Sequence, residues 1–300
     1  RSELMLKMYN RQSHAGNTPD FWEENWAASH FEESLQFMAV DPLRPVFEEY
    51  LRPDSKMLEG GCGMGNYVAY YAARGYDVTG LDFAQRALTT LHIRQPNLKL
   101  VGGDVSNMPF PDKAFDLYYS GGVVEHFESG ATESLREARR VLKDDGILLI
   151  SVPYYNPLRK IIRPFRKEYW RSVMESKTEA ERIEGKKFFQ YAYTKGEFKK
   201  MLSEAGLETI KTQGYAVLWG IREIPFFDRN AESEVPPYQS KAVRTEPAYV
   251  DVTAFIADRK MSLIKRLAVS EDHSIPLLGL GVKLMRWSVA NMMMYVCRPF

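Results

Sequence analysis

Three glycines alternate along the chain at Gly61, Gly63 and Gly65, directly after a short apolar strand pattern and directly before a helical one. Without a Cβ atom, the backbone there can turn sharply and approach a ligand closely. An acidic residue, Glu59, stands just before them. This pattern favours a nucleotide-like cofactor, whose polar groups can meet backbone N–H groups at the start of a helix. Asn66 stands where the dinucleotide fingerprint requires another glycine, so the chain does not match the NAD pattern.

Acidic residues also follow the next two predicted strands, as Asp82 and Asp104. The Asp82 carboxylate is suited to accept hydrogen bonds from the two hydroxyls of a ribose. It is equally suited to cap the helix that starts at Ala84. Phe83 beside it would pack on an adenine ring. Because the carboxyl ends of parallel strands meet at one edge of a sheet, we expect these residues to lie near Glu59.

A histidine preceded by a glutamate, Glu125-His126, follows the fourth predicted strand. A histidine with a pKa near neutral would deprotonate a substrate hydroxyl, so both residues are candidate catalytic groups. The alternative is that the pair holds its loop by hydrogen bonds.

The acidic residue and the glycine turn together resemble the acidic-x-Gly-x-Gly-x-Gly turn of class I S-adenosylmethionine (SAM) dependent methyltransferases. The resemblance covers about residues 50–217 and the last strand, and it implies SAM as the cofactor. It implies that Glu59 lies under the cofactor and that Cys62 contributes its backbone. It further implies that Asp104 and Val105 contact the adenine and that Ser120 and Gly121 line the wall next to the reactive methyl group.

The Glu-His pair is also similar to ubiquinone-pathway O-methyltransferases, in which a Glu-x-x-Glu-His run is associated with a divalent metal. Gly122 stands at the first acidic position here, so we expect no metal, because hard cations need several oxygen ligands. The run from Ser151 to Arg159 loosely resembles methyltransferases of bacterial polysaccharide and lipid-linked saccharide pathways, which implies an acceptor of that class.

Short apolar runs alternate with helical segments between residues 54 and 152, which is typical of βαβ units. We predict an α/β fold with a Rossmann-like seven-stranded sheet, helices on both faces, and lid insertions after strands five and six. The resemblance implies that the last strand is antiparallel. The expected strands are 56–58, 77–81, 98–101, 115–119, 147–152, 207–217 and 292–296, and the expected helices are 66–74, 84–94, 132–142, 194–206, 252–268 and 277–290.

We expect one methyltransferase domain over residues 1–300. Its expected parts are N-terminal cap helices (1–50), a SAM-binding core (51–153), a lid insertion (154–193), more core (194–217), a second lid (218–290) and the final strand (291–300). Both insertions would leave from the carboxyl edge of the sheet and cover the site.

The first insertion combines basic and aromatic residues. Its positive charge would hold a phosphate or carboxylate of the substrate, or dock on an anionic membrane. The alternative is a solvated lid helix whose aromatic rings pack on the core. The candidate substrate contacts are Tyr154, Arg159, Tyr191 and Tyr193. Near the N-terminus, Trp22 and Trp26 recur at helical spacing and would either fold over the cofactor, as the resemblance implies, or pack in the core.

The composition is that of a globular protein: 300 residues, 45% hydrophobic and 26% charged, with a net charge of +1. That charge gives no reason to expect nucleic-acid binding. Two distant cysteines, Cys62 and Cys297, favour a reducing compartment, so we expect a cytoplasmic or membrane-peripheral location.

The leading hypothesis is therefore a SAM-dependent methyltransferase acting on a small or lipid-linked acceptor, by O-methylation of a saccharide or related metabolite. The alternatives are a nucleic-acid methyltransferase and a SAM-binding regulatory protein without transferase activity. The oligomeric state is not readable from the sequence.

Overall fold

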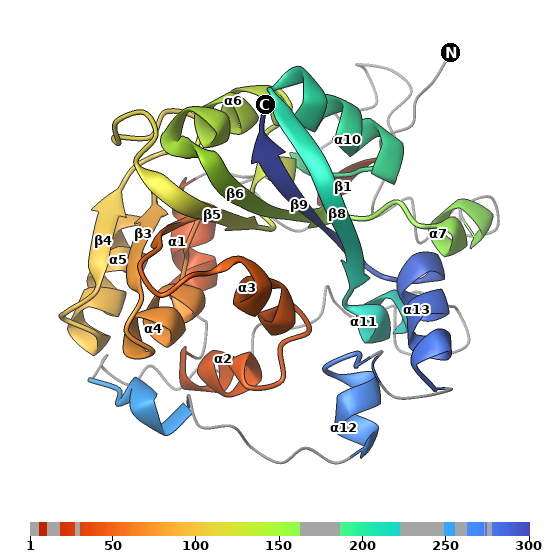
Figure 1. Cartoon of the computed structure of the whole chain (residues 1–300), viewed down its shortest axis with the longest axis horizontal. Helices are drawn as coiled ribbons and strands as arrows, with labels where there is room; N and C mark the ends of the chain where they lie inside the picture. The colour runs from red at the N-terminus through yellow and green to blue at the C-terminus, as the bar shows by residue number, and fades with distance from the viewer. Residues whose placement is uncertain are drawn as a thin grey trace.

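Seven strands pair in one mixed sheet in the order β4-β3-β2-β5-β6-β9-β8, as the computed structural model shows (Figure 1). The structure describes residues 6–10, 19–27, 31–162, 187–222, 249–255, 263–272, 274 and 278–300. The strands of this sheet are β2 (Lys56–Gly60), β3 (Asp77–Asp82), β4 (Lys99–Gly102), β5 (Phe115–Gly121), β6 (Leu142–Pro153), β8 (Leu207–Tyr215) and β9 (Met292–Pro299).

Neighbouring strands from β4 to β6 are parallel, whereas β9 runs antiparallel to both β6 and β8. The carboxyl ends of β2, β3, β4, β5, β6 and β8 therefore meet at one edge. This arrangement confirms the predicted Rossmann-like sheet with an antiparallel last strand.

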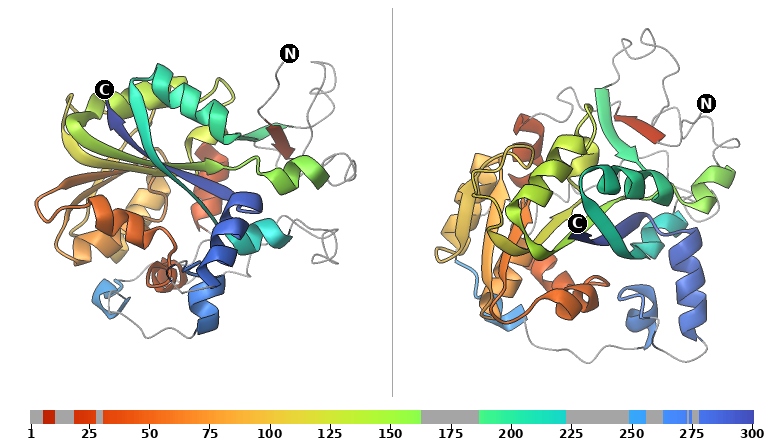
Figure 2. Two further views of the ribbon diagram at one scale, coloured as in Figure 1. Left: turned by 45° about the vertical axis from the view of Figure 1, so that its right-hand side comes forward. Right: turned by 45° about the horizontal axis from the view of Figure 1, so that its top comes forward.

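Helices cover both faces of the sheet (Figures 1 and 2). On one face, α6 (Thr132–Val141) and α10 (Lys195–Glu204) bury residues such as Leu135 and Phe198. On the other, α3 (Arg44–Tyr50), α4 (Asn66–Ala73) and α5 (Gln85–Arg94) bury residues such as Phe47 and Tyr71. Two apolar layers thus enclose the sheet, and its carboxyl edge is left for the loops.

The remaining elements gather around that edge and one side of the molecule. They are α1 (Pro19–Ala27), α2 (Phe31–Met38), the 3₁₀ turn η1 (Val124–His126), α7 (Pro157–Ile162), α11 (Val217–Arg222), η3 (Val252–Phe255), α12 (Leu263–Ala268) and α13 (Leu278–Ser288). A separate two-stranded sheet joins β1 (Leu6–Asn10) to β7 (Lys187–Ala192), antiparallel. This small sheet ties the N-terminal part of the chain to the first predicted insertion.

The helix α10 begins as its sequence predicts. The Thr194 side chain accepts from the N–H of Glu197, and the Glu197 carboxylate accepts from the N–H of Thr194 at 2.9 Å. Two backbone donors at the start of the helix are satisfied in this way, which is the arrangement of a capping box.

Two predicted elements differ from the structure. The α-helix expected over 252–268 is present at its end, as α12, and is wrong at its start, where residues 252–255 form the 3₁₀ turn η3; residues 256–262 lie outside the described residues. The strand predicted at 147–152 begins earlier, at Leu142. Within this strand, residues 143–146 bulge out of the pairing with β5, opposite Asp116. Lys143 holds this bulge by donating to Asp116 at 2.7 Å.

Much of both predicted lids, residues 163–186 and 223–248, lies outside the described residues. The domain divisions inside the chain stay predictions.

Candidate cofactor and acceptor site

The glycine turn follows β2 directly and requires glycine at all three positions. Gly61, Gly63 and Gly65 have φ values of +74°, +49° and +66°, in the left-handed region that side chains disfavour. Each is also closely packed. A Cβ atom at Gly63 would lie 2.6 Å from the Trp26 ring, and Cβ atoms at Gly61 and Gly65 would collide with Val123 and Leu91.

Two buried carboxylates fix this turn to the helices around it. Glu59 accepts the N–H of Val68, in the first turn of α4, at 3.1 Å. Asp82 accepts the N–H of Gly63 at 2.7 Å with one oxygen and that of Ala84 at 2.8 Å with the other. Burial raises the pKa of both carboxyls. Asp82 is therefore not the N-cap of α5, which is Ala84 with no side-chain cap bond, but it bridges the glycine turn to the start of this helix.

The helix α1 lies over the turn from the N-terminal side. Besides its contact with Gly63, Trp26 stacks on Trp22 at 5.8 Å between ring centroids. Trp22 in turn meets the His126 ring edge-on at 4.8 Å. A single helix thus spans the distance from the glycine turn to the candidate base, so Trp22 and Trp26 cover the site.

Glu23 is a residue of this site that sequence reasoning missed. Both of its carboxylate oxygens accept the N–H of Arg86, at 3.0 Å each, which ties α1 to the first turn of α5. Its charge is also among the groups that raise the pKa of Asp82. The sequence shows an acidic residue within the aromatic run 20–26, but its spacing does not indicate a contact with residue 86.

The loop after β4 carries Asp104 and Val105. Asp104 is exposed, and one of its oxygens accepts both the N–H and the hydroxyl of Ser106 at 2.8 Å. Val105 is 4% exposed and packs in the core beneath the sheet's α6 face. Phe83, the other candidate adenine contact, is 37% exposed. The adenine contacts of these residues stay predictions.

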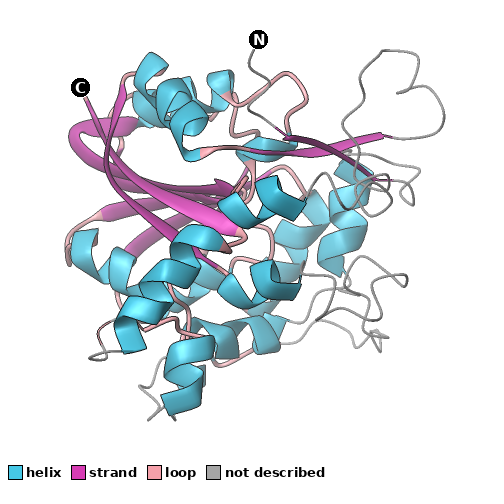
Figure 3. Cartoon of the chain, turned by 90° about the vertical axis from the view of Figure 1, so that its right-hand side faces the viewer, coloured by secondary structure: helices cyan, strands magenta, loops and turns pink. Residues whose placement is uncertain are grey.

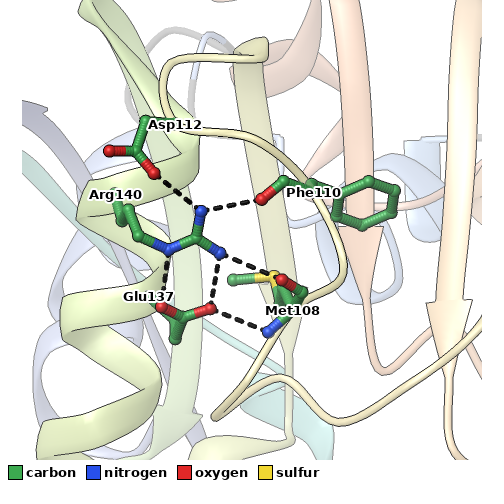
Figure 4. A network of polar contacts seen from close by, with 5 residues as sticks. All are labelled: Met108, Phe110, Asp112, Glu137 and Arg140. Atoms are coloured by element: carbon green, nitrogen blue, oxygen red, sulfur yellow. Dashed lines mark hydrogen bonds and ion pairs between the residues drawn. The ribbon is translucent and has the colours of Figure 1, made fainter.

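Arg140 of α6 holds the loop that follows β4 in place (Figure 4). Its guanidinium donates to the carbonyls of Met108 and Phe110 at 3.0 and 2.7 Å and to Asp112 at 2.9 Å. Two further bonds, of 2.7 and 2.8 Å, go to Glu137, whose carboxylate also accepts the Met108 N–H. These paired bonds with the acids raise the pKa of Arg140, which stays charged.

Ser120 and Gly121 are the last two residues of β5. Ser120 is 1% exposed, and a Cβ atom at Gly121 would collide with the Tyr119 hydroxyl. Cys62 is buried in the glycine turn, and its N–H donates to the Leu81 carbonyl at 3.0 Å. Their predicted contacts with the cofactor stay predictions.

Glu125 is a buried acid that lacks a compensating charge. Its side chain is 2% exposed, and Oε2 has no hydrogen-bond partner within the described part of the chain. Burial raises its pKa to about 8, so the carboxyl is protonated at neutral pH. The hydroxyl of Tyr193 is also buried without a hydrogen-bond partner among the described residues.

His126 is held in one tautomer. Its Nδ1 lies 2.8 Å from the carbonyl oxygen of Phe189, and because a carbonyl can only accept, Nδ1 carries the proton. Nε2 is then the acceptor nitrogen. Burial lowers the pKa of His126 to about 4, so the ring is neutral at pH 7 and weakly basic.

The four candidate substrate residues lie around the end of β6, and most have internal roles. Tyr154 and Tyr193 form a backbone bridge, and the Tyr191 hydroxyl donates to the Glu128 carbonyl at 2.9 Å. Arg159 is 3% exposed and donates to the Tyr154 carbonyl at 2.7 Å and to Asn291. Arg159 thereby holds the end of β6 to the start of β9, and substrate contact by these residues stays a prediction.

The groups at this edge suit SAM. The three glycines keep the turn free of side chains of its own, in space already shared with Val123, Trp26 and Leu91, and buried Glu59 and Asp82 can meet a cationic ligand or ribose hydroxyls. Each Asp82 oxygen already accepts one backbone N–H, but a carboxylate has about four acceptor positions in all. The described residues include no group of three metal-ligating side chains placed to hold an ion, and none of their helices could cross a membrane.

The strand order and the glycine turn define a Rossmann-like nucleotide-binding domain, and comparisons with known proteins identify its class. Residues 58–150 match the methyltransferase domain family. A chain of the complex between the Haloferax volcanii Trm112 methyltransferase activator and the putative methyltransferase has the same fold, with a TM-score of 0.50, 14% identity, and coverage of 93% of this chain and 97% of that one.

Curated relatives agree with this class. The malonyl-[acyl-carrier protein] O-methyltransferase of Serratia marcescens is 34% identical over 33% of this chain and 38% of its own length. The demethylmenaquinone methyltransferase of Staphylococcus haemolyticus is 29% identical over 55% of this chain and 74% of its own. The match thus spans less than half of the Serratia protein's length. The chain carries a class I SAM-dependent methyltransferase domain, whose cofactor is S-adenosylmethionine.

Proposed function

We propose that the whole chain transfers a methyl group from SAM to an oxygen of a small or lipid-linked acceptor. The observation that carries this proposal is the meeting of two sets of residues at one sheet edge. The glycine turn with Asp82 and the η1 loop with His126 are bridged by the ring pair Trp22–Trp26. A cofactor cradle and a candidate acceptor site are therefore neighbours.

SAM supplies a methyl group bound to a positively charged sulfur, which an acceptor oxygen can displace. Asp82 and Glu59 would hold the cofactor's ribose and amino groups. The η1 loop and the Trp22 ring would exclude water from the acceptor. Positioning of this kind, rather than covalent catalysis, supplies the rate in such a displacement.

His126 would act on the acceptor hydroxyl through Nε2, because Phe189 fixes the proton on Nδ1. With a pKa of about 4, the ring is a poor base for an alcohol and accepts a hydrogen bond better than it removes a proton. We therefore assign it to orienting the hydroxyl, and its Nε2 takes the proton once the oxygen has bonded to the methyl group and become acidic. Protonated Glu125 would donate a hydrogen bond at the same loop.

The acceptor class rests on two lines of support. The Serratia relative is named as an O-methyltransferase, which favours transfer to oxygen. The run Ser151–Arg159, at the end of β6, is similar to saccharide-pathway methyltransferases and favours a saccharide or related metabolite. Binding of a membrane by the basic residues of 163–171 falls outside the described residues and stays a prediction, as do the cytoplasmic location and the lack of nucleic-acid binding.

Calorimetry with SAM and its product tests the cofactor half of the proposal. Wild type should bind both, and Asp82→Ala should bind at least about tenfold more weakly, because a charge-assisted pair of hydrogen bonds is lost. Asp77→Ala, at the start of the same strand, is the matched control. A screen of hydroxylated acceptors for S-adenosylhomocysteine release then tests transfer. Tight SAM binding without turnover on any acceptor would favour a SAM-binding regulatory protein.

A further inference from the structure

The helix α13 exposes apolar residues on the side that faces away from the protein. Its buried side consists of Gly279, Val282 and Arg286. Its opposite side carries Leu280, Leu284 and Trp287, which are 66%, 57% and 63% exposed. Their spacing of three and four places them together on one stripe. A surface helix normally has its polar residues there, so this arrangement is inverted.

Neighbouring helices extend the apolar stripe. Ile161 of α7 is 65% exposed, and Leu218 and Trp219 of α11 are 45% and 47% exposed. Leu263 of α12 is 53% exposed. The four helices lie together at one side of the molecule (Figure 1), which Figure 3 shows face on. We call this surface, formed by α7, α11, α12 and α13, the helical corner. Exposed apolar side chains gathered on one side of a protein are typical of an interaction site.

The helical corner is also basic. Its segments 157–162, 217–222, 263–272 and 278–288 contain seven Lys or Arg residues, of which Arg159 and Arg286 are buried, and two acidic residues. Both acids are neutralised within the corner, since Glu271 pairs with Arg286 at 3.1 Å and Asp272 with Arg266 at 2.7 Å. The apolar stripe is therefore accompanied by an excess of positive charge.

A basic cavity opens beside the stripe. It has a volume of about 340 Å³ and is lined by Lys195, Lys211, Lys283 and Arg286, with Tyr154 and Trp287 among its other walls. Lys211 pairs with Glu49, and Arg286 with Glu271. Within the described residues, Lys195 and Lys283 pair with no carboxylate. Burial, and to a smaller extent the neighbouring Lys199, lowers the pKa of Lys195.

We propose that the helical corner docks on an anionic lipid bilayer, with the stripe of α13 among the lipid chains and a lipid phosphate in the basic cavity. Tryptophan beside lysine suits the interface of a bilayer, where the ring is buried and the cation meets phosphate. A bilayer satisfies the apolar stripe and the unpaired lysines together. A neutral protein partner would leave the lysines without counter-charges.

The helical corner lies at the same edge of the sheet as the candidate site. The helices α7 and α11 follow the carboxyl ends of β6 and β8, and α13 enters β9 at the same edge. The glycine turn lies at that edge too. Docking would therefore turn the candidate site toward the membrane, where a lipid-linked acceptor resides. The docking itself requires no methyl transfer, so it can be tested without the proposed activity.

Vesicle co-sedimentation of the full chain, without SAM, tests the proposal. Vesicles of phosphatidylcholine alone are compared with vesicles that also contain phosphatidylglycerol. Wild type should bind the anionic vesicles more tightly and lose binding as salt is raised. Leu284→Ser with Trp287→Ser should weaken binding at least about tenfold, because two apolar side chains no longer enter the bilayer. Lys283→Glu should reduce binding to the level of neutral vesicles.

Matched controls separate docking from general effects on the protein. Phe37→Ser with Ile93→Ser removes two side chains that are 49% and 46% exposed on α2 and α5, away from the corner, and should bind as wild type does. Brominated lipid should quench tryptophan emission of wild type more than that of Trp287→Phe, which reports insertion directly and does not depend on stability.

Equal binding of wild type and the Leu284/Trp287 variant, or no binding by wild type, overturns the proposal. So does a loss of dimers in that variant without any vesicle binding, which would make the corner a contact between two copies of the chain.

Discussion

The Trp26 ring lies so close to Gly63 that a Cβ atom added to the glycine would be 2.6 Å from it. The same helix is tied to α5 through Glu23 and the N–H of Arg86. A cofactor that contacts Gly63 through its backbone must therefore share this space with Trp26 or displace it. We therefore infer that α1 acts as a cover over the glycine turn.

Opening of α1 should limit SAM binding. In stopped-flow measurements, the observed rate for wild type should level off as SAM is raised, because the cover opens at its own rate. Trp26→Ala and Glu23→Gln should each raise that limiting rate about threefold or more, since each removes a contact that holds the cover closed. Trp219→Ala, in α11, should leave it unchanged. A rate that rises linearly with SAM in wild type would contradict this prediction.

A methyl group at Gly63 should weaken cofactor binding while the fold survives. Gly63→Ala meets the Trp26 ring and places an alanine at φ +49°, which costs about 1–2 kcal/mol. We expect SAM affinity measured by calorimetry to fall at least about tenfold. Gly196→Ala is the control, because nothing lies within 4 Å of its Cβ position. In the double variant with Trp26→Ala, affinity should recover only in part, since the backbone strain remains.

The glycine turn and the strand ends could be predicted from sequence because their signals are local. A glycine that must adopt positive φ and an acid that ends an apolar run are visible within a few residues. The surroundings of His126 were not predictable. Its partner Phe189 lies on β7, which pairs with β1 across about 180 residues, and such a pairing leaves no local pattern.

Two other features of the structure were not predicted from the sequence, for different reasons. Glu23 accepts a hydrogen bond from a backbone N–H that lies 63 residues away in the sequence. Nothing in the sequence distinguishes Glu23 from another acidic residue on the same face of the helix. The run Lys143–Gly146 contains a turn signal, and the pairing of β6 with β5 is interrupted there. The strand β6 nevertheless begins before this run. The sequence showed the interruption and not the Leu142 pairing that precedes it.

Arg140 should contribute both to the stability of the fold and to SAM binding. Arg140→Lys keeps the charge but cannot make the paired bonds to Glu137 and the carbonyls of Met108 and Phe110 together. Urea denaturation should show a loss of about 1–2 kcal/mol. SAM affinity should also fall, because the loop that carries Asp104 loses its anchor. Arg136→Lys, exposed on the same helix, is the control and should change neither quantity.

Glu125 and His126 should give the protein an unusual pH dependence of stability. Burial raises the pKa of Glu125 from 4.5 to about 8 and lowers that of His126 from 6.5 to about 4. Between pH 4.5 and 6.5 the unfolded chain binds the His126 proton that the folded chain rejects, and releases the Glu125 proton that the folded chain keeps. The two slopes of stability against pH therefore oppose each other in this interval.

From pH 6.5 to 8 only Glu125 still contributes. The folded state then holds a proton that the unfolded state has released, so this group lowers stability as pH rises, by about 2 kcal/mol over the interval. Glu125→Gln cannot titrate and should lack that loss. In urea denaturation at the two pH values, the difference in unfolding free energy between variant and wild type should shift by about that amount in favour of the variant. Glu133→Gln, on the exposed side of α6, should show no shift. An unchanged difference between the two pH values would mean that the buried carboxyl is ionised in the folded protein, and it could then not donate a hydrogen bond at the η1 loop.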